Sequence, residues 1–486
     1  MSIFLDWNYG VPFLLPPDPS EWLPRGHEAY FVANMILKLT RGDVLTTRDP
    51  ELGGRPAYHP IMMLMVIVFA YLRGVRSSRK IARLLQENVA FKVLSCDQQP
   101  DFRTICLFRK NHHQWFENML ARTIHVAMVL RVIDFSATVV DGTPIQASAN
   151  SKHNHTLPSL KALREKHLAA LAAKHAKNMI LEADTIDALE DQTLGDDVGS
   201  ESMLRGLRDE KLDRIDAAIA LAQALGKERN QAVRKAKSRI RRKIASKAKL
   251  SNRCFTPSKS RGKVFRIKSR RRLREDKAQK LLGKLAKVAI PKRPKVNTVD
   301  PDSKVLKAKN DGYMQGHQII RATDLHSGMI LSNHVSPTGG ESRELWGCIG
   351  RVLNVTGLRK LHRVVTDAGY SGEPNLCDPL RTRVLEVLIC QRGQEKAKSP
   401  IIQKQLKQNK KKKYWMRRRG IAEGSNAGTK EARGMRRFLL RGRLGAAIEL
   451  ALDAVAHNIM KLRSKFYKLT ETKLTLALQR AAAVEI

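Results

Sequence analysis

Two aspartates in the sequence follow short apolar stretches that are rich in β-branched residues. Asp141 follows ATVV at residues 137–140, and Asp367 follows RVVT at residues 363–366. Such stretches predict strands, and the small residues after each aspartate predict a turn at which the strand ends. Two carboxylates at the ends of neighbouring central strands would be held rigidly and could bind divalent ions such as Mg²⁺. An aspartate before a small residue is also common in ordinary turns, so neither position is specific alone.

A third carboxylate, Glu423, lies between two cations in the sequence. Arg419 comes four residues before it and Lys430 seven residues after it. An α-helix with 3.6 residues per turn would place all three side chains on one face, as a metal ligand beside bound DNA phosphates requires. The alternative is an exposed Arg–Glu pair at i,i+4 spacing, which is common on helices. Glycines at 420 and 424 weaken the helix prediction.

Other catalytic patterns are weaker or absent. His153 and His155 could bind a metal ion, but without a second ligand pair a polar loop is the simpler interpretation. Ser371 and Ser425 lack the Gly-x-Ser-x-Gly frame of a serine nucleophile, and the sequence contains no phosphate-binding loop of the Gly-x4-Gly-Lys-Ser/Thr type. The six cysteines include no Cys-x-x-Cys pair, which argues against a zinc ribbon or a secreted disulfide scaffold and favours a reducing cytoplasm.

The N-terminal 130 residues have the pattern of several short helices. One is predicted after Pro60, which suits a first helical turn, one after Ser77 as its N-cap, and one after Asp101. Short helices that carry Arg and Lys are compatible with DNA recognition of the helix-turn-helix type. An ordinary helical bundle with solvated charges explains the same pattern equally well.

The sequence after Asp141 divides into a long helical segment and a region that mixes strands with helices. Residues 159–295 are predicted to be helical, and residues 229–274 contain no Asp or Glu, which favours DNA-backbone contact over a solvated face or arm. Further along, residues 317–322 and 329–334 predict a hairpin, and 363–367 and 384–390 predict two strands joined by a parallel crossover. Residues 345–355 and the region from 421 onward predict helices.

The composition restricts the class of partner. The chain has 486 residues, of which 42% are hydrophobic, and its 89 Lys and Arg against 46 Asp and Glu give a formal net charge of +43. So large an excess of positive charge predicts a polyanionic partner, either nucleic acid or an anionic membrane. The most apolar run, residues 61–72, is shorter than the roughly 20 residues needed to span a bilayer. The first residues have no signal-peptide pattern, so nucleic acid is the expected partner.

Together these motifs resemble the insertion-sequence transposases of the DDE type. The resemblance rests on VVDGT at 139–143, on VVTDAGY at 364–370, and on the Arg-x3-Glu-x6-Lys signature formed by Arg419, Glu423 and Lys430. Met416 stands where the family usually has a tyrosine, and Glu431 is the nearest alternative to Glu423. Further matching segments are residues 59–62, 71–79, 100–105, 300–302, 438–442 and 457–460, so the resemblance spans nearly the whole chain, with residues 159–295 as an insertion.

The resemblance implies an α+β architecture with an RNase H-like mixed-sheet catalytic core, interrupted by a basic helical insertion and preceded by a helical N-terminal domain. The expected divisions are a DNA-binding domain at 1–130, the first part of the core at 131–158, the insertion at 159–295, the remainder of the core at 296–465, and a C-terminal tail at 466–486.

The resemblance also implies the chemistry. Asp141, Asp367 and Glu423 would be the catalytic residues and would bind two Mg²⁺ ions, with Mn²⁺ as a possible substitute, while Arg419 and Lys430 would contact DNA. The enzyme would cleave transposon ends and join the 3′-hydroxyl to target DNA. Its partners would be double-stranded DNA and further copies of itself, in the bacterial cytoplasm at the nucleoid. The alternative is a catalytically inactive descendant that acts as a DNA-binding repressor or architectural protein.

Overall fold

The protein is represented by a computed structural model. The structure describes residues 18, 21–41, 43, 57–171, 210–252, 295–308, 312–371, 373–390, 400–418 and 420–466. The chain divides into two compact units, one formed by residues 1–149 together with 302–486 and the other by residues 150–301. None of the described helices is long and apolar enough to cross a membrane.

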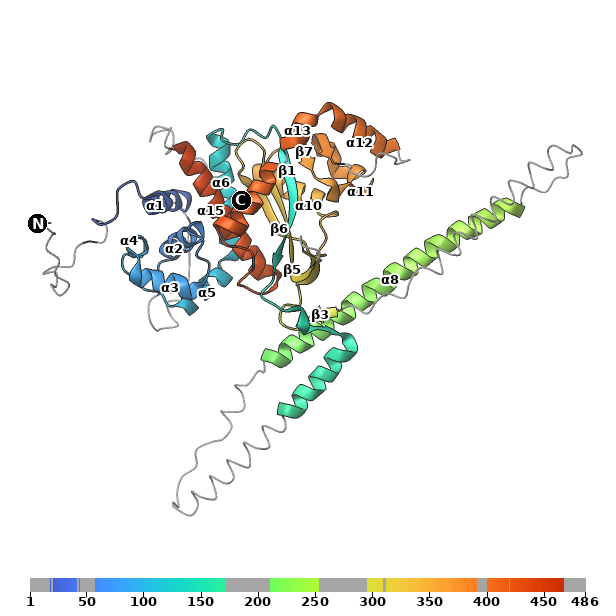
Figure 1. Ribbon diagram of the computed structural model, residues 1–486, viewed down its shortest axis with the longest axis horizontal. Helices are drawn as coiled ribbons and strands as arrows, with labels where there is room; N and C mark the ends of the chain where they lie inside the picture. Colours follow the sequence, from blue (N-terminus) through green and yellow to red (C-terminus); the bar gives the residue numbers. More distant parts are fainter. Residues whose placement is uncertain are drawn as a thin grey trace, which may run out of the picture. The chain divides into compact units, whose positions relative to one another are not determined.

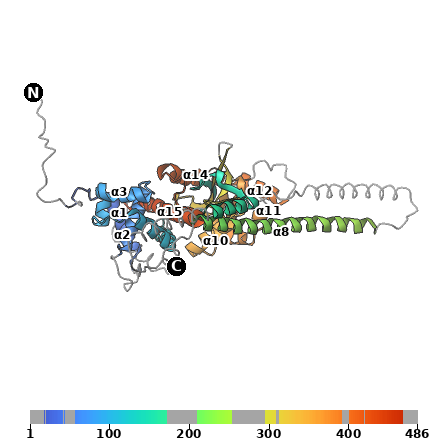
Figure 2. The same ribbon diagram turned by 90° about the horizontal axis from the view of Figure 1, so that it is seen from below.

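The N-terminal part of the first unit is helical, as predicted. Its helices are α1 (Glu28–Leu39), α2 (Pro60–Leu72), α3 (Ser78–Glu87), α4 (Val89–Ser95), α5 (Phe102–Asn111) and α6 (His113–Val129). Pro60 begins α2, and Asp101 caps α5 through a bond from the Arg103 amide. Ser77 is the N-cap residue of α3, as predicted, but its side chain makes no capping hydrogen bond. Of these, α1, α2, α5 and α6 contact α15 (Gly442–Phe466) (Figures 1 and 2).

A mixed sheet follows. Its strands are β1 (Thr138–Gln146), β4 (Lys304–Lys307), β5 (Tyr313–Asp324), β6 (Ile330–Val335), β7 (Leu361–Thr366) and β8 (Val384–Ile389). The order is β4-β5-β1-β7-β8, and β6 pairs with β5 as the predicted hairpin. Strands β1, β7 and β8 are mutually parallel, which confirms the crossover prediction, whereas β5 runs antiparallel to β1. The crossover from β7 to β8 passes through η3 (Ala368–Tyr370), α11 (Glu373–Leu376) and η4 (Pro379–Arg383).

One strand boundary differs from the prediction. Strand β1 does not end in a turn at Asp141 but continues to Gln146, because all nine of its residues pair with β5. Gly142 is therefore part of the extended strand. Only Asp367 stands just beyond the end of its strand, β7, where it caps η3.

The two faces of the sheet pack against different helices. Val140 and Val364 belong to the large core that includes α10 (Leu345–Thr356), α15 and the N-terminal helices. Val139 and Val365 pack instead with Trp415 and Ile421 on the opposite face. The last two come from α13 (Lys413–Arg418) and α14 (Gly420–Ala427), which follow α12 (Pro400–Lys411). Successive residues of a strand point to opposite faces, so parity along β1 and β7 tells which layer each side chain meets.

The second unit has a small core of its own. It contains η2 (Ser151–His153), the paired strands β2 (Asn154–Thr156) and β3 (Lys295–Asn297), a helix over residues 157–171, and the 43-residue helix α8 (Glu210–Asn252). Leu160, Ala218, Ala222 and Val296 form its buried centre. The prediction of helix for residues 159–295 is confirmed at residues 159–171 and in α8. The rest of residues 159–295 lies outside the described residues.

Candidate active site

The two predicted aspartates lie side by side. In the parallel register between β1 and β7, Val140 pairs with Thr366, so Asp141 and Asp367 follow at corresponding positions on adjacent strands. Alternate residues of a strand point to the same face of the sheet, so Asp141 shares a face with Val139, and Asp367 with Val365. Both aspartates are therefore directed toward the layer of α13 and α14. Both are half-buried, and Asp367 accepts a hydrogen bond of 2.9 Å from the Gly369 amide. The expected adjacency of the two strands is thus found.

Helix α14 supplies the third group from the facing layer. Asn426 is buried and its Nδ2 atom donates a 2.8 Å hydrogen bond to Oδ2 of Asp141. Glu423 lies three residues earlier, which is nearly the same helix face, and its side chain is exposed. Burial and the charge of Asp367 raise the pKa of Asp141 most, and the negative charge of Glu423 adds to that rise. Helix α14 is therefore anchored to Asp141 through Asn426, and Glu423 stands on nearly the same face of that helix.

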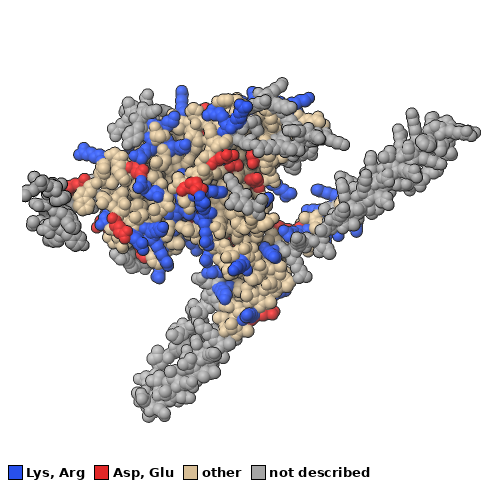
Figure 3. All heavy atoms as spheres, viewed as in Figure 1, with Lys and Arg blue, Asp and Glu red and all other residues tan. Residues whose placement is uncertain are grey.

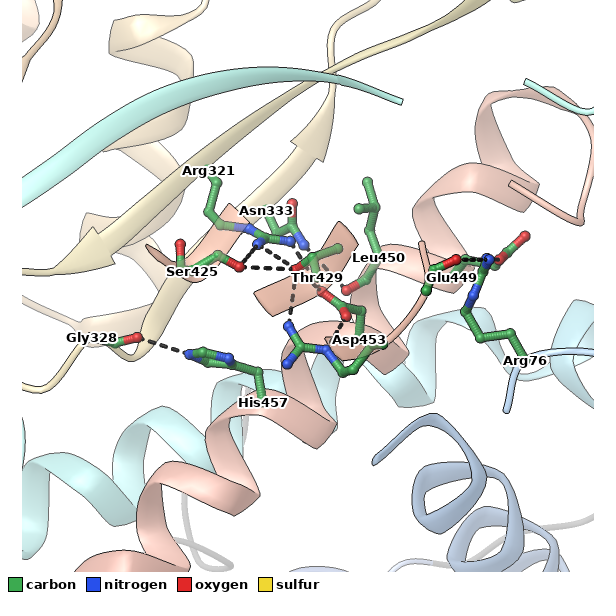
Figure 4. A network of polar contacts seen from close by, with 12 residues as sticks. Arg76, Arg321, Gly328, Asn333, Ser425, Thr429, Glu449, Leu450, Asp453 and His457 are labelled. Atoms are coloured by element: carbon green, nitrogen blue, oxygen red, sulfur yellow. Dashed lines mark hydrogen bonds and ion pairs between the residues drawn. The ribbon is translucent and has the colours of Figure 1, made fainter. Parts of the chain in front are cut away.

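A buried polar network holds the end of α14 in place (Figure 4). Arg321, opposite Asp141 on β5, donates to Ser425 O at 3.1 Å, to Thr429 Oγ1 at 2.7 Å and to Asp453 Oδ2 at 3.1 Å. Asp453, on α15, also accepts bonds from Arg433 and Thr429. All of these side chains are nearly or fully enclosed, so the loss of one charged partner would leave another charge buried and unpaired.

The N-terminal helices reinforce the same region. After α14 the chain makes a π-helical turn, η5 (Gly428–Ala432). Gly74, with φ of +75°, lies against this turn, since a β-carbon there would be 3.2 Å from the Ala432 carbonyl oxygen. Arg76 then donates to Gly434 O at 2.6 Å and to Glu449 Oε2 at 2.8 Å, in a buried ion pair with α15. The 71–79 motif thus joins the N-terminal helices to the frame of the site.

A further carboxylate, Glu341, enters the site just before α10. A β-carbon at residue 142 would overlap its Oε2 atom, and one at residue 369 would overlap its Oε1 atom. The same position at residue 369 is 3.2 Å from Oδ1 of Asp367. Gln318, on β5, donates a 3.1 Å bond to Glu341. Glu341 thus lies beside Gly142 and Gly369, where its charge acts on the same region as those of Asp141 and Asp367.

Burial and the closeness of these acids raise the pKa values of two of them, Asp141 and Glu341. Burial raises the pKa of Asp141, and the charges of Asp367 and Glu423 raise it further, against the bonds from Asn426 and the Gly142 amide. Burial, followed by the charges of Asp367 and Asp141, raises the pKa of Glu341 to about 7. A site in which acids repel one another is poised to gain from a cation.

The raised pKa of Glu341 gives a stability prediction. A carboxyl whose pKa is higher folded than unfolded binds its proton more tightly in the folded state, so stability falls as pH rises from about 4.5 to above 7. We expect Glu341→Gln to stabilise the metal-free protein at pH 8 by about 1 kcal/mol, less than the full shift because solvent screens a half-buried group. At pH 4.5 it should change little.

Chemical denaturation in EDTA at the two pH values measures this effect. An equal loss of stability at both values would show that the Glu341 carboxylate is a favourable structural contact rather than a repelled charge.

The residues present suit a hard divalent cation. They offer carboxylate oxygens from Asp141, Asp367 and Glu423, and the buried Oδ1 atom of Asn426 has no hydrogen-bond partner among the described residues. Oxygen ligands of this kind are those that Mg²⁺ and Mn²⁺ prefer. In the described part of the chain, no three acidic, His or Cys side chains already stand close enough to enclose an ion.

The remaining predicted site residues are placed less fully. Arg419 lies outside the described residues. Lys430 is half-buried within the π-helical turn, so α-helical spacing from Glu423 does not fix its direction. Sequence reasoning missed Asn426, whose only signal was its i+3 spacing from Glu423, and it missed Glu341 and Arg321, which no local motif marks. His153 and His155 take part in no metal-ligand cluster among the described residues.

Two family models match the chain. Residues 17–111 match the model described as "Transposase domain (DUF772)", and residues 291–459 match the model described as "Transposase DDE domain". The second range contains Asp367 and Glu423, whereas Asp141 lies between the two ranges. No curated protein and no solved structure matches the chain. The DDE domain has an RNase H-like core, so the matches confirm the predicted fold class, a helical N-terminal region before an α+β mixed sheet.

Proposed function

We propose that this chain, which belongs to the DDE transposases of insertion sequences, cleaves the ends of its element and joins the resulting 3′-hydroxyl to target DNA. The observation that carries the proposal is the register that sets Asp141 beside Asp367, under a helix that bears Glu423. These three residues are proposed as the catalytic set.

The carboxylates would hold two Mg²⁺ ions, or Mn²⁺ in their place. When bound, such ions lower the pKa of water and stabilise the charge on the leaving oxygen. The chain's own contribution is rigidity. Asp141 is fixed by the sheet and by Asn426, Asp367 by the Gly369 amide, and α14 by the network around Arg321. A site held this firmly loses little free energy to reorganisation during the reaction.

Double-stranded DNA is the proposed substrate and target. Figure 3 shows Lys and Arg widely spread over the visible face, with the acidic side chains confined to small patches. Arg419 and Lys430 are proposed to steady the phosphate backbone beside the catalytic acids. Pairing two transposon ends would require more than one copy of the chain, and a chromosomal substrate would place the enzyme at the bacterial nucleoid in the cytoplasm.

Helix α8 is proposed as a sequence-independent DNA contact. Six of its basic residues, none of them buried, lie close together in the segment without acids, namely Arg234, Lys235, Lys237, Arg239, Arg241 and Arg242. Replacing all six by Gln should weaken DNA binding and flatten its salt dependence, because each lost phosphate contact removes about 0.9 from the slope of log K against log salt.

Binding titrations at several salt concentrations, with DNA of related and unrelated sequence, measure this slope. A slope equal to that of the wild type would show that α8 does not contact DNA.

Excision in cells tests the proposed function. A plasmid would carry a marker between the two DNA ends that flank this gene, with the full chain supplied from a second plasmid. We expect sequencing across the donor site to show loss of the marker. If the chain instead lowers transcription from the element's end and no excision occurs, it is the inactive repressor.

A further inference from the structure

We propose that Glu341 is a fourth acidic metal ligand of the catalytic site and reaches it from the face of the sheet opposite α14. The inference rests on the proposed function, because it concerns the same site. Glu341 lies four residues before the first residue of α10, whose helix packs with Val140 and Val364 on that opposite face. The acids would therefore meet from both layers, beside the end of β7 and the middle of β1.

The chain leaves space for this side chain at two places. Gly142 and Gly369 each stand one or two residues after a catalytic aspartate, and a β-carbon at either position would overlap a carboxylate oxygen of Glu341. Gly142 lies in regular extended strand and has no positive φ, so its backbone conformation does not require glycine. The close approach of Glu341 explains why this position has no side chain. Both glycines are those of the family-like motifs DGT and DAGY.

The side of β1 that faces β7 is also only partly paired near the site. The last pair between β1 and β7 is Val140 with Thr366, and the next strand-like contact on that side of β1 is the bridge from Gln146 to Arg437. Within the described residues, the intervening part of β1 has no strand beside it there. The Glu341 carboxylate lies over Gly142, on the face of the sheet to which a side chain at that position would point.

The loop holds Glu341 firmly in its position. On one side, Ser336 Oγ donates to Gly340 O at 2.7 Å. On the other, Asn375 Nδ2 donates to Ser342 O at 2.6 Å, and Gln318 holds the carboxylate itself. Residues on both sides of Glu341 are thus tied down, which is the preorganisation that a metal ligand needs.

A purely structural role does not account for Glu341. Among the described residues it forms no ion pair with Lys, Arg or His, and, besides burial, the charges that raise its pKa are those of two further acids, Asp367 and Asp141. A half-buried carboxylate among like charges destabilises a fold. A function at the site explains why it is there. Two divalent ions carry four positive charges, which Asp141, Asp367, Glu423 and Glu341 together would balance.

Calorimetric titration of the full chain with Mn²⁺, without DNA, tests the inference. We expect Glu341→Gln to weaken Mn²⁺ binding by about tenfold or more. The matched control is Glu344→Gln, three residues along the same segment, whose carboxylate lies 3.5 Å from His334 and should leave Mn²⁺ binding within about twofold of the wild type. A second variant, Gly369→Ala, should weaken binding similarly by displacing the intact Glu341, and should add little further loss when combined with Glu341→Gln.

The outcomes separate this inference from the proposed function. If Asp141→Asn loses Mn²⁺ binding while Glu341→Gln binds like the wild type, Glu341 is not a ligand and the inference fails alone. If the wild type binds no Mn²⁺ and cleaves no DNA, the proposed function fails with it. A Glu341→Gln variant that does not fold is replaced by Gly369→Ala, whose normal Mn²⁺ affinity would equally overturn the inference.

Discussion

Replacing Asp141 by Asn is expected to reduce cleavage of transposon-end DNA by at least about a thousandfold while leaving DNA binding nearly unchanged. The substitution keeps the size and shape of the side chain but removes the negative charge that would hold Mg²⁺. Binding depends on Lys and Arg residues elsewhere in the chain, so it should survive.

Cleavage of labelled end DNA in Mg²⁺, measured beside a binding titration of the same protein, tests this expectation. The matched control is Asp134→Asn, an exposed aspartate seven residues earlier, which should cleave like the wild type. Equal cleavage by the two variants would remove Asp141 from the catalytic set.

Replacing Asp453 by Asn is expected to lower the free energy of unfolding by about 3–5 kcal/mol. Burial alone would raise the pKa of Asp453, yet the charges of Arg433 and Arg321 lower it, so the carboxylate is ionised. Its removal leaves two arginines, one fully enclosed and one nearly so, without a counter-charge. It also frees Thr429 and the π-helical turn after α14, so cleavage should fall as well.

The control for this prediction is Glu431→Gln on the same turn. Glu431 pairs with Arg436 on the surface, where both side chains are more than half exposed, so its loss should cost less than about 1 kcal/mol. Urea denaturation of both variants gives the comparison. Equal midpoints for Asp453→Asn and Glu431→Gln would show that the buried network does not support α14.

The sequence predicted the elements of the fold better than their ends. The β-branched run before Asp367 and the hairpin at 317–334 were recognised because local alternation and turn residues specify them. The predicted end of β1 at Asp141 was wrong. Strand β5, more than 170 residues away in the sequence, pairs with the residues past Gly142, and this pairing outweighs the preference of Asp141 and Gly142 for a turn. The π-helical turn likewise depends on Arg321 and Asp453, which no local pattern reveals.

The site was predictable where it coincides with motifs. Asp141 and Asp367 follow from strand patterns, and their adjacency follows from parallel pairing. Glu341 was not predictable, because its segment, GGES, reads as a loop and only the tertiary structure brings it between Gly142 and Gly369. Asn426 was hidden for the same reason: its importance lies in a bond to a residue 285 positions away in the chain.

Metal-dependent cleavage and joining by the wild-type chain tests the central claim most directly. The purified protein would be incubated with labelled DNA from the end of its element and with a circular target, in Mg²⁺, in Mn²⁺ and in EDTA. We predict a new 3′-hydroxyl at the element end, and its covalent joining to the target, with either metal and not in EDTA. Tight binding to the end DNA without cleavage in either metal would contradict the claim and identify the chain as a DNA-binding protein.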